Sequence, residues 1–76
     1  MQHLGVIGLG TMGANLARNA ARSGAAVAVY NRTTEKTDAF ITAHGKEGKF
    51  TGCRTIEGLV SALPAPRHIL LMVNAG

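Results

Sequence analysis

Short apolar runs alternate along the chain with longer segments in which apolar residues recur every three or four positions. Residues 2–7 form an apolar run that ends at a glycine, as expected of a buried parallel strand. Residues 25–30 form a second run with β-branched and aromatic side chains, and residues 68–73 form another continuous apolar run. Residues 50–54 are a shorter candidate. The pattern therefore predicts four strands.

The segments between these strands have helical spacing. Residues 11–23 place polar side chains on one face and apolar ones on the other, the apolar set being Met12, Leu16, Ala17, Ala20 and Ala21. The small residues in this set are expected to let the helix lie close on a sheet. Thr11 is expected to cap the start of this helix. Gly24 suits the left-handed conformation just past its end.

Two further helices are expected. One covers residues 35–44, begins at a cap formed by Thr33 or Thr34, ends at Gly45, and turns inward Phe40, Ile41 and Ala43. Residues 46–49 are polar and contain a glycine, which indicates a loop. The other helix begins at a Thr55 cap, ends at Pro64 and Pro66, and has at helical spacing Ile56, Leu59, Val60 and Leu63.

Alternating strands and helices predict an α/β fold with a parallel sheet and right-handed crossovers. We expect a Rossmann-like, doubly wound sheet in the strand order 3-2-1-4, with a ligand bound beyond the carboxyl ends of strands 1 and 4. A dinucleotide fold ordinarily has six strands. Residues 1–76 are therefore expected to be the amino-terminal part of such a domain, with the sheet incomplete.

Composition narrows the choice of partner. The 76 residues suit one small domain, and a net charge of +4 favours an anionic partner. The basic residues are scattered and only three aromatic residues are present, so a phosphorylated small molecule is preferred to nucleic acid. No apolar run approaches the ~20 residues of a membrane helix. The lone Cys53 is expected to be a buried apolar side chain. A single cysteine forms no internal disulfide, which fits a reducing compartment, and we therefore expect a cytoplasmic protein.

Three glycines follow the first strand in the spacing G-x-G-x-x-G and open the first helix. Gly8 would allow the tight turn, Gly10 would let the backbone approach a pyrophosphate, and Gly13 would let the helix pack on the strand. The free N–H groups and the positive dipole end of the helix would then meet the phosphates. The three histidines, by contrast, lack metal-ligand spacing, and no metal site is expected.

The end of the second strand indicates which dinucleotide is bound. An NAD site normally has Asp or Glu there to bind the ribose 2′-hydroxyl, whereas this chain has Asn31. Asn31 can donate hydrogen bonds to a 2′-phosphate, Arg32 can clamp that phosphate or stack on adenine, and Thr33 can add a hydroxyl. NADP(H) is therefore the predicted cofactor. Lys36 is either a further charge for this phosphate or a solvated helix residue.

The pieces "GLGTMGANLARN", "VAVYNRTTEKTDAFI" and "PRHILLMVNAG" resemble the amino-terminal part of 6-phosphogluconate dehydrogenase, and the resemblance covers nearly the whole chain. It implies a pyrophosphate site at Gly8, Leu9, Gly10, Thr11, Met12 and Gly13, with Met12 toward the nicotinamide. It implies a 2′-phosphate site at Asn31, Arg32 and Thr33, and a nicotinamide side lined by Val73, Asn74 and Ala75. The family often has Ala at the position of Gly10 and Lys at that of Asn74.

The resemblance also implies an activity. The family oxidises 6-phosphogluconate with NADP⁺ and releases CO₂ to give ribulose 5-phosphate, in the pentose phosphate pathway, as a homodimer. Its catalytic lysine, glutamate and substrate cluster would lie beyond residue 76, so no catalytic residue is assigned here and the chain alone is expected to be inactive. Two alternatives remain: a related 3-hydroxyacid dehydrogenase of the 3-hydroxyisobutyrate type, and a nucleotide-binding module without chemistry.

Overall fold

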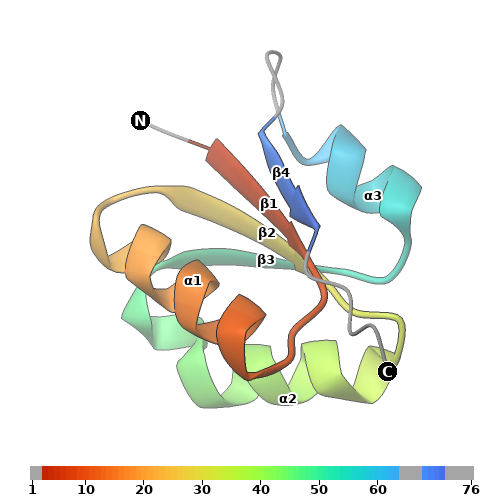
Figure 1. The fold of residues 1–76 in the computed structure, drawn as a ribbon, viewed down its shortest axis with the longest axis horizontal. Helices are drawn as coiled ribbons and strands as arrows, with labels where there is room; N and C mark the ends of the chain where they lie inside the picture. Colours follow the sequence, from red (N-terminus) through yellow and green to blue (C-terminus); the bar gives the residue numbers. More distant parts are fainter. Residues whose placement is uncertain (1–2, 64–67, 72–76) are drawn as a thin grey trace.

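The computed structural model describes residues 3–63 and 68–71, and strands and helices alternate along them (Figure 1). In chain order the elements are β1 (His3–Ile7), α1 (Thr11–Arg22), β2 (Ala26–Tyr30), α2 (Thr34–His44), the 3-10 turn η1 (Gly45–Glu47), β3 (Lys49–Cys53), α3 (Ile56–Ser61) and β4 (Ile69–Leu71). The alternation predicted from the apolar pattern is confirmed.

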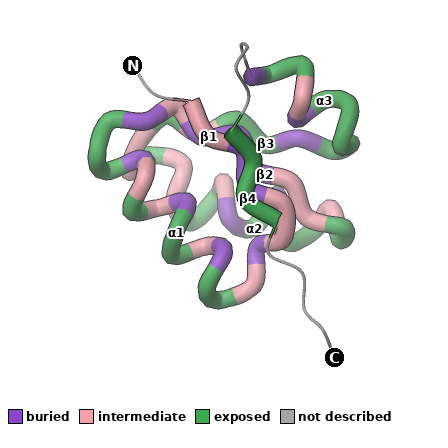
Figure 2. The backbone as a smooth tube through the Cα atoms, turned by 45° about the horizontal axis from the view of Figure 1, so that its top comes forward, coloured by how far each residue is buried: buried purple, intermediate pink, exposed green. Residues whose placement is uncertain are grey.

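The four strands form one parallel sheet in the order β3-β2-β1-β4, as predicted. The register pairs Ile7 with Tyr30 on one side and with Leu71 on the other, and pairs Tyr30 with Cys53. The carboxyl ends of all four strands therefore meet at one edge of the sheet. β4 is exposed along its length, because β1 is its one strand neighbour within the described ranges (Figure 2).

The helices cover both faces of the sheet, with α1 and α2 on one and α3 on the other (Figure 1). Alternate residues of a strand point to opposite faces. Val27 and Val29 accordingly belong to the core beneath α1 and α2, while Ala28 belongs to a smaller core with residues of α3. Gly5 faces α3 and the residues just after it, where an added Cβ would lie 3.0 Å from Leu59 Cδ2 and 2.8 Å from Leu63 Cδ1. This helix can therefore approach the sheet closely.

The buried face of α1 consists of its smallest residues. Gly13, Ala17 and Ala21 are the buried residues of this helix, whereas Met12 and Leu16 are exposed at 66% and 37% of their surface. Positions four apart lie on one face of a helix, and the smallest side chains lie against the strands. The expected small-residue face against the sheet is therefore confirmed, and Met12 and Leu16 of the apolar set lie outside it.

Other local predictions were shifted or corrected. Gly10 is the N-cap of α1 and Thr11 its first helical residue, so Thr11 does not cap the helix. In α2, Ala43 is exposed and Thr37 is buried beside Phe40. The expected loop at residues 46–49 is divided between the η1 turn and the start of β3.

Two predicted helix ends are confirmed. Gly24 has φ +99°, the left-handed region expected after α1. The Thr55 hydroxyl accepts a hydrogen bond from the Gly58 N–H at 2.9 Å and so caps α3. Pro64 and Pro66, predicted to end that helix, lie outside the described residues.

A charged cluster joins the far ends of α1 and α2. The Glu47 carboxylate accepts two hydrogen bonds from the Arg18 guanidinium, at 2.8 and 3.0 Å, and its Oε2 lies 3.0 Å from His44 Nδ1. The hydrogen bond from Arg18 is the main cause that lowers the pKa of Glu47 to about 2, followed by that from His44. The cluster fastens η1 against α1.

Cys53 is buried as expected, and burial raises the pKa of its thiol. Across residues 3–63 and 68–71, no three His, Cys, Asp or Glu side chains are grouped so as to hold a metal ion. No helix in this part of the chain has the length and apolar content needed to cross a membrane.

Candidate functional site

The turn from β1 into α1 is built around a glycine in the left-handed region. Gly8 has φ +99°, a conformation that side-chain-bearing residues rarely adopt. Its N–H donates a 2.8 Å hydrogen bond to the Tyr30 carbonyl, which extends the β1–β2 pairing by one residue. The chain then reverses direction at the carboxyl edge of the sheet, where ligands bind in folds of this type.

The start of α1 has backbone donors with no side-chain partner. Gly10 adopts an extended conformation (φ −68°, ψ −178°) at the N-cap, makes no side-chain capping hydrogen bond, and is followed by a first turn without acidic residues. The first N–H groups of a helix have no intrahelical acceptor, and they carry the positive end of the helix dipole. This end of α1 is therefore suited to an anion such as a pyrophosphate.

Leu9 connects this loop to the interior and to the second strand. Its side chain is 9% exposed and belongs to the core under α1 and α2. Its N–H donates a 2.8 Å hydrogen bond to Asn31 Oδ1, across 22 residues of sequence. Two of the sequence-predicted site segments are thus in direct contact.

Asn31 is itself held by the segment that follows it. Its backbone N–H donates to the Thr37 hydroxyl at 3.0 Å, and its Nδ2 donates to the Thr33 carbonyl at 3.4 Å. Thr37 is 2% exposed, and this hydrogen bond gives its buried hydroxyl a partner. The end of β2 and the start of α2 are thereby fixed relative to the glycine loop.

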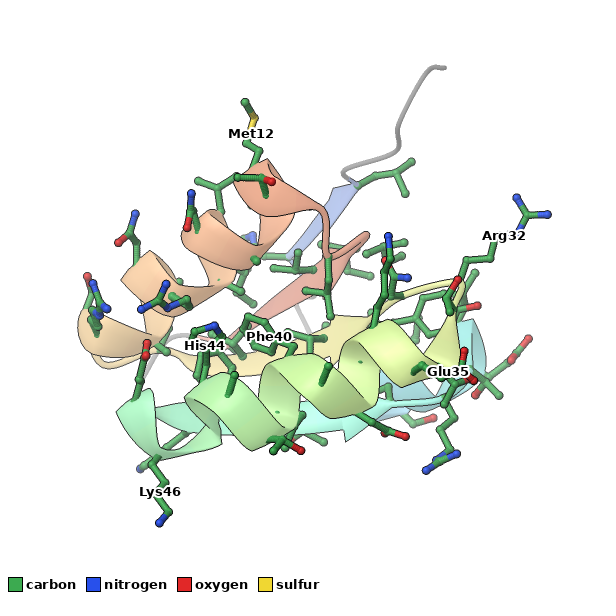
Figure 3. The ribbon with its side chains drawn as sticks, turned by 90° about the horizontal axis from the view of Figure 1, so that it is seen from below. Met12, Arg32, Glu35, Phe40, His44 and Lys46 are labelled. Atoms are coloured by element: carbon green, nitrogen blue, oxygen red, sulfur yellow. The ribbon has the colours of Figure 1, made fainter. Side chains whose placement is uncertain are left out.

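Arg32 and Thr33 lie exposed at the rim beside this loop. In the structure as described, the Arg32 guanidinium forms no ion pair, and Figure 3 shows it projecting outward from the turn before α2. The Thr33 hydroxyl makes no capping hydrogen bond and is free to meet a ligand. Glu35 and Lys36 are both exposed on the next turn.

Arg54 is a rim residue that the sequence argument did not single out. It directly follows β3, and the pairing of Tyr30 with Cys53 places it next to Asn31 at the same edge. Its Nη2 lies 3.6 Å from Asp38 Oδ2, with both side chains largely exposed. The feature of the sequence that could have identified Arg54 is its place at the carboxyl end of the third predicted strand, residues 50–54.

The remaining predicted residues divide into two groups. Met12 is exposed at the start of α1 and points away from the sheet (Figure 3). Val73, Asn74 and Ala75 lie outside the described residues. The register of β4 on β1, with Leu71 opposite Ile7, ends at the same edge as the glycine loop.

Comparison with known proteins gives the family of this chain. A model of the family described as the NAD binding domain of 6-phosphogluconate dehydrogenase matches residues 3–76. Decarboxylating 6-phosphogluconate dehydrogenases of Treponema pallidum and Dictyostelium discoideum are 52% and 49% identical over 96% of this chain. An NADP(+)-dependent, decarboxylating 6-phosphogluconate dehydrogenase of Bacillus subtilis is 50% identical over 99% of it.

The chain spans about 15% of the length of these relatives. The residues of this chain that match the family, 3–76, include the glycine loop, the β2–α2 turn and the sheet edge described above. The NAD-binding assignment carried by the family agrees with the uncapped start of α1 and with the confirmed strand order. The chain belongs to the family of the NAD-binding domain of 6-phosphogluconate dehydrogenase.

Proposed function

We propose that this chain binds NADP(H) at the carboxyl edge of its sheet, with the pyrophosphate on the start of α1. The observation that carries this proposal is the uncapped first turn after Gly10, which offers backbone N–H donors without a competing carboxylate. The left-handed conformation of Gly8 brings the backbone to this point without a side chain in the way. These features fit a dinucleotide pyrophosphate.

The preference for NADP over NAD rests on the residues after β2. A carboxylate at position 31 would bind a ribose 2′-hydroxyl and repel a 2′-phosphate, whereas Asn31 is uncharged. Arg32 is exposed and without an ion pair in the described structure, so it is available to the phosphate. A guanidinium matches the geometry of a phosphate through paired hydrogen bonds. Thr33 adds a hydroxyl at the same turn.

We further propose that, in a chain of the relatives' length, this segment serves the oxidative decarboxylation of 6-phosphogluconate in a cytoplasmic homodimer. NADP⁺, when bound, supplies the acceptor for the hydride that leaves the substrate. The residues described here hold and orient the dinucleotide, and none of them is assigned a part in proton transfer. Gly10 and Asn74 stand where the family often has Ala and Lys; Gly10 suits the turn, whereas Asn74 removes a positive charge from the nicotinamide side.

The test is a calorimetric titration of the chain with NADP⁺ and, separately, with NAD⁺. The proposal expects NADP⁺ to bind at least tenfold more tightly. Equal affinity would refute the assignment of the 2′-phosphate site, and absence of binding to both would refute the cofactor site. For the activity, NADP⁺ reduction by the longer protein is measured with 6-phosphogluconate and, as the alternative substrate, 3-hydroxyisobutyrate.

A further inference from the structure

Asn31 has its amide oxygen turned toward the glycine loop. The Leu9 N–H donates to Asn31 Oδ1 at 2.8 Å, which is a short hydrogen bond for an N–H group and an oxygen. We propose that Asn31 is a positioning residue that holds the glycine loop in its pyrophosphate-binding shape, a role separate from the direct contact with the 2′-phosphate that is assigned above to Arg32 and Thr33. This inference rests on the proposed binding of NADP(H) and assigns a separate role within that site.

The Leu9 contact fixes the middle of the loop. Its side chain lies in the core and its N–H points to Asn31, so the residue between Gly8 and Gly10 is anchored at both its backbone and its side chain. The Gly8 N–H is bound to the Tyr30 carbonyl at 2.8 Å. Both of these N–H groups point to the end of β2. The donors left for a ligand are those that follow, at the start of α1.

The Asn31 amide is itself oriented by its neighbours. Its Nδ2 donates to the Thr33 carbonyl at 3.4 Å, and its backbone N–H donates to the buried Thr37 hydroxyl at 3.0 Å. A reversed amide would place its NH₂ group against the Leu9 N–H and its oxygen against the Thr33 carbonyl, which are two repulsive contacts. The network therefore fixes the oxygen toward Leu9. Asn31 thus joins the end of β2 to the loop after β1 through its side chain and to α2 through its backbone N–H.

This role makes a different prediction from direct reading of the 2′-phosphate. The pyrophosphate is common to NAD⁺ and NADP⁺, so loss of the loop anchor must weaken both cofactors by the same factor. Loss of a group that contacts the 2′-phosphate must weaken NADP⁺ alone. Substitutions at Asn31 and Arg32 therefore separate the two roles.

Asn31→Leu keeps the approximate volume of the side chain and removes the acceptor. It is expected to weaken NAD⁺ and NADP⁺ each by about tenfold, the effect of one lost hydrogen bond, with their ratio preserved within about twofold. Asn31→Asp keeps the acceptor for the Leu9 N–H, adds a charge, and replaces the Nδ2 donor at the exposed 3.4 Å contact with the Thr33 carbonyl by an oxygen. It should retain NAD⁺ binding and weaken NADP⁺. The comparison variant Arg32→Ala should weaken NADP⁺ alone.

A second readout needs no cofactor. Hydrogen exchange of the Leu9 amide, followed by NMR in the ¹⁵N-labelled chain, should be slow in the unsubstituted protein and in Asn31→Asp, and at least tenfold faster in Asn31→Leu. Amides at the centre of β2 should exchange at the same rate in all three proteins. If Asn31→Leu fails to fold, Asn31→Asp decides, because loss of NAD⁺ binding there would contradict the retained anchor.

Two results would overturn the inference: a loss confined to NADP⁺ in Asn31→Leu, or Leu9 exchange that does not change in that variant. Failure of the proposed function looks different. In that case the unsubstituted chain binds neither cofactor, and the Leu9 exchange rates alone decide whether Asn31 anchors the loop.

Discussion

Replacing Arg32 by alanine removes the charge proposed to read the 2′-phosphate. The side chain is exposed and forms no ion pair with the described residues, so its loss should change the free energy of unfolding by no more than about 0.5 kcal/mol. Hydrogen bonds to charged groups contribute about 1.5–3 kcal/mol, and each 1.4 kcal/mol is about tenfold in affinity. We therefore expect NADP⁺ to bind about 10- to 150-fold more weakly, toward the lower end because the site is open to water.

The assay is calorimetric titration of the variant with both cofactors, at low salt and again at physiological salt. Screening should shrink the NADP⁺ effect at the higher salt concentration, and NAD⁺ affinity should be unchanged at both. Arg22→Ala is the matched control, because it removes the same charge from the last turn of the 12-residue helix α1, about 18 Å from the glycine loop along the helix. Equal weakening of NAD⁺ and NADP⁺ by Arg32→Ala would refute the reasoning.

Three further changes test the fold around the site. Gly5→Ala should lower the free energy of unfolding by about 1 kcal/mol, since the added methyl would lie 2.8 Å from Leu63 Cδ1, the end of a side chain that can turn aside; denaturant unfolding measures this, and an unchanged midpoint would show that the Leu63 side chain moves without cost. Thr55→Ala should cost about 0.5–2 kcal/mol in the same assay through loss of the α3 cap, whereas Thr55→Ser should keep most of the stability. The pKa of Glu47 is lowered to about 2 from an ordinary 4.5, so its stabilisation is complete above pH 4.5 and is lost as the pH falls toward 2. Thermal unfolding of Glu47→Gln should accordingly show a smaller decline over that pH range, and an identical decline would contradict the ion cluster.

Much of the fold could be predicted because it depends on local pattern. Apolar runs and helical spacing gave the strands, the helices and their order, and the G-x-G-x-x-G spacing located the turn after β1. On α1, helical periodicity defines a broad apolar stripe that includes the larger Met12 and Leu16 beside a face of small residues. The sheet then selects the smallest residues within that stripe, from Gly13 to Ala21.

Contacts between distant residues were the part that sequence could not supply. Nothing local indicates that Glu47 pairs with Arg18, 29 residues away, and this contact accompanies the η1 turn where a loop was expected. The Asn31 side chain could be assigned to a phosphate from its chemistry alone. Its hydrogen bond to the Leu9 N–H depends on the pairing of β1 with β2, which brings together two residues that are 22 positions apart in the sequence.

The most direct test of the central claim is to map where NADP⁺ binds. Amide shifts of the ¹⁵N-labelled chain are recorded by NMR during titration with NADP⁺. The account predicts the largest changes at residues 8–13 and 31–33, at the carboxyl edge of the sheet. Changes centred instead on Arg18, Arg22 and Glu47, at the far end of α1, or no changes at saturating NADP⁺, would contradict it.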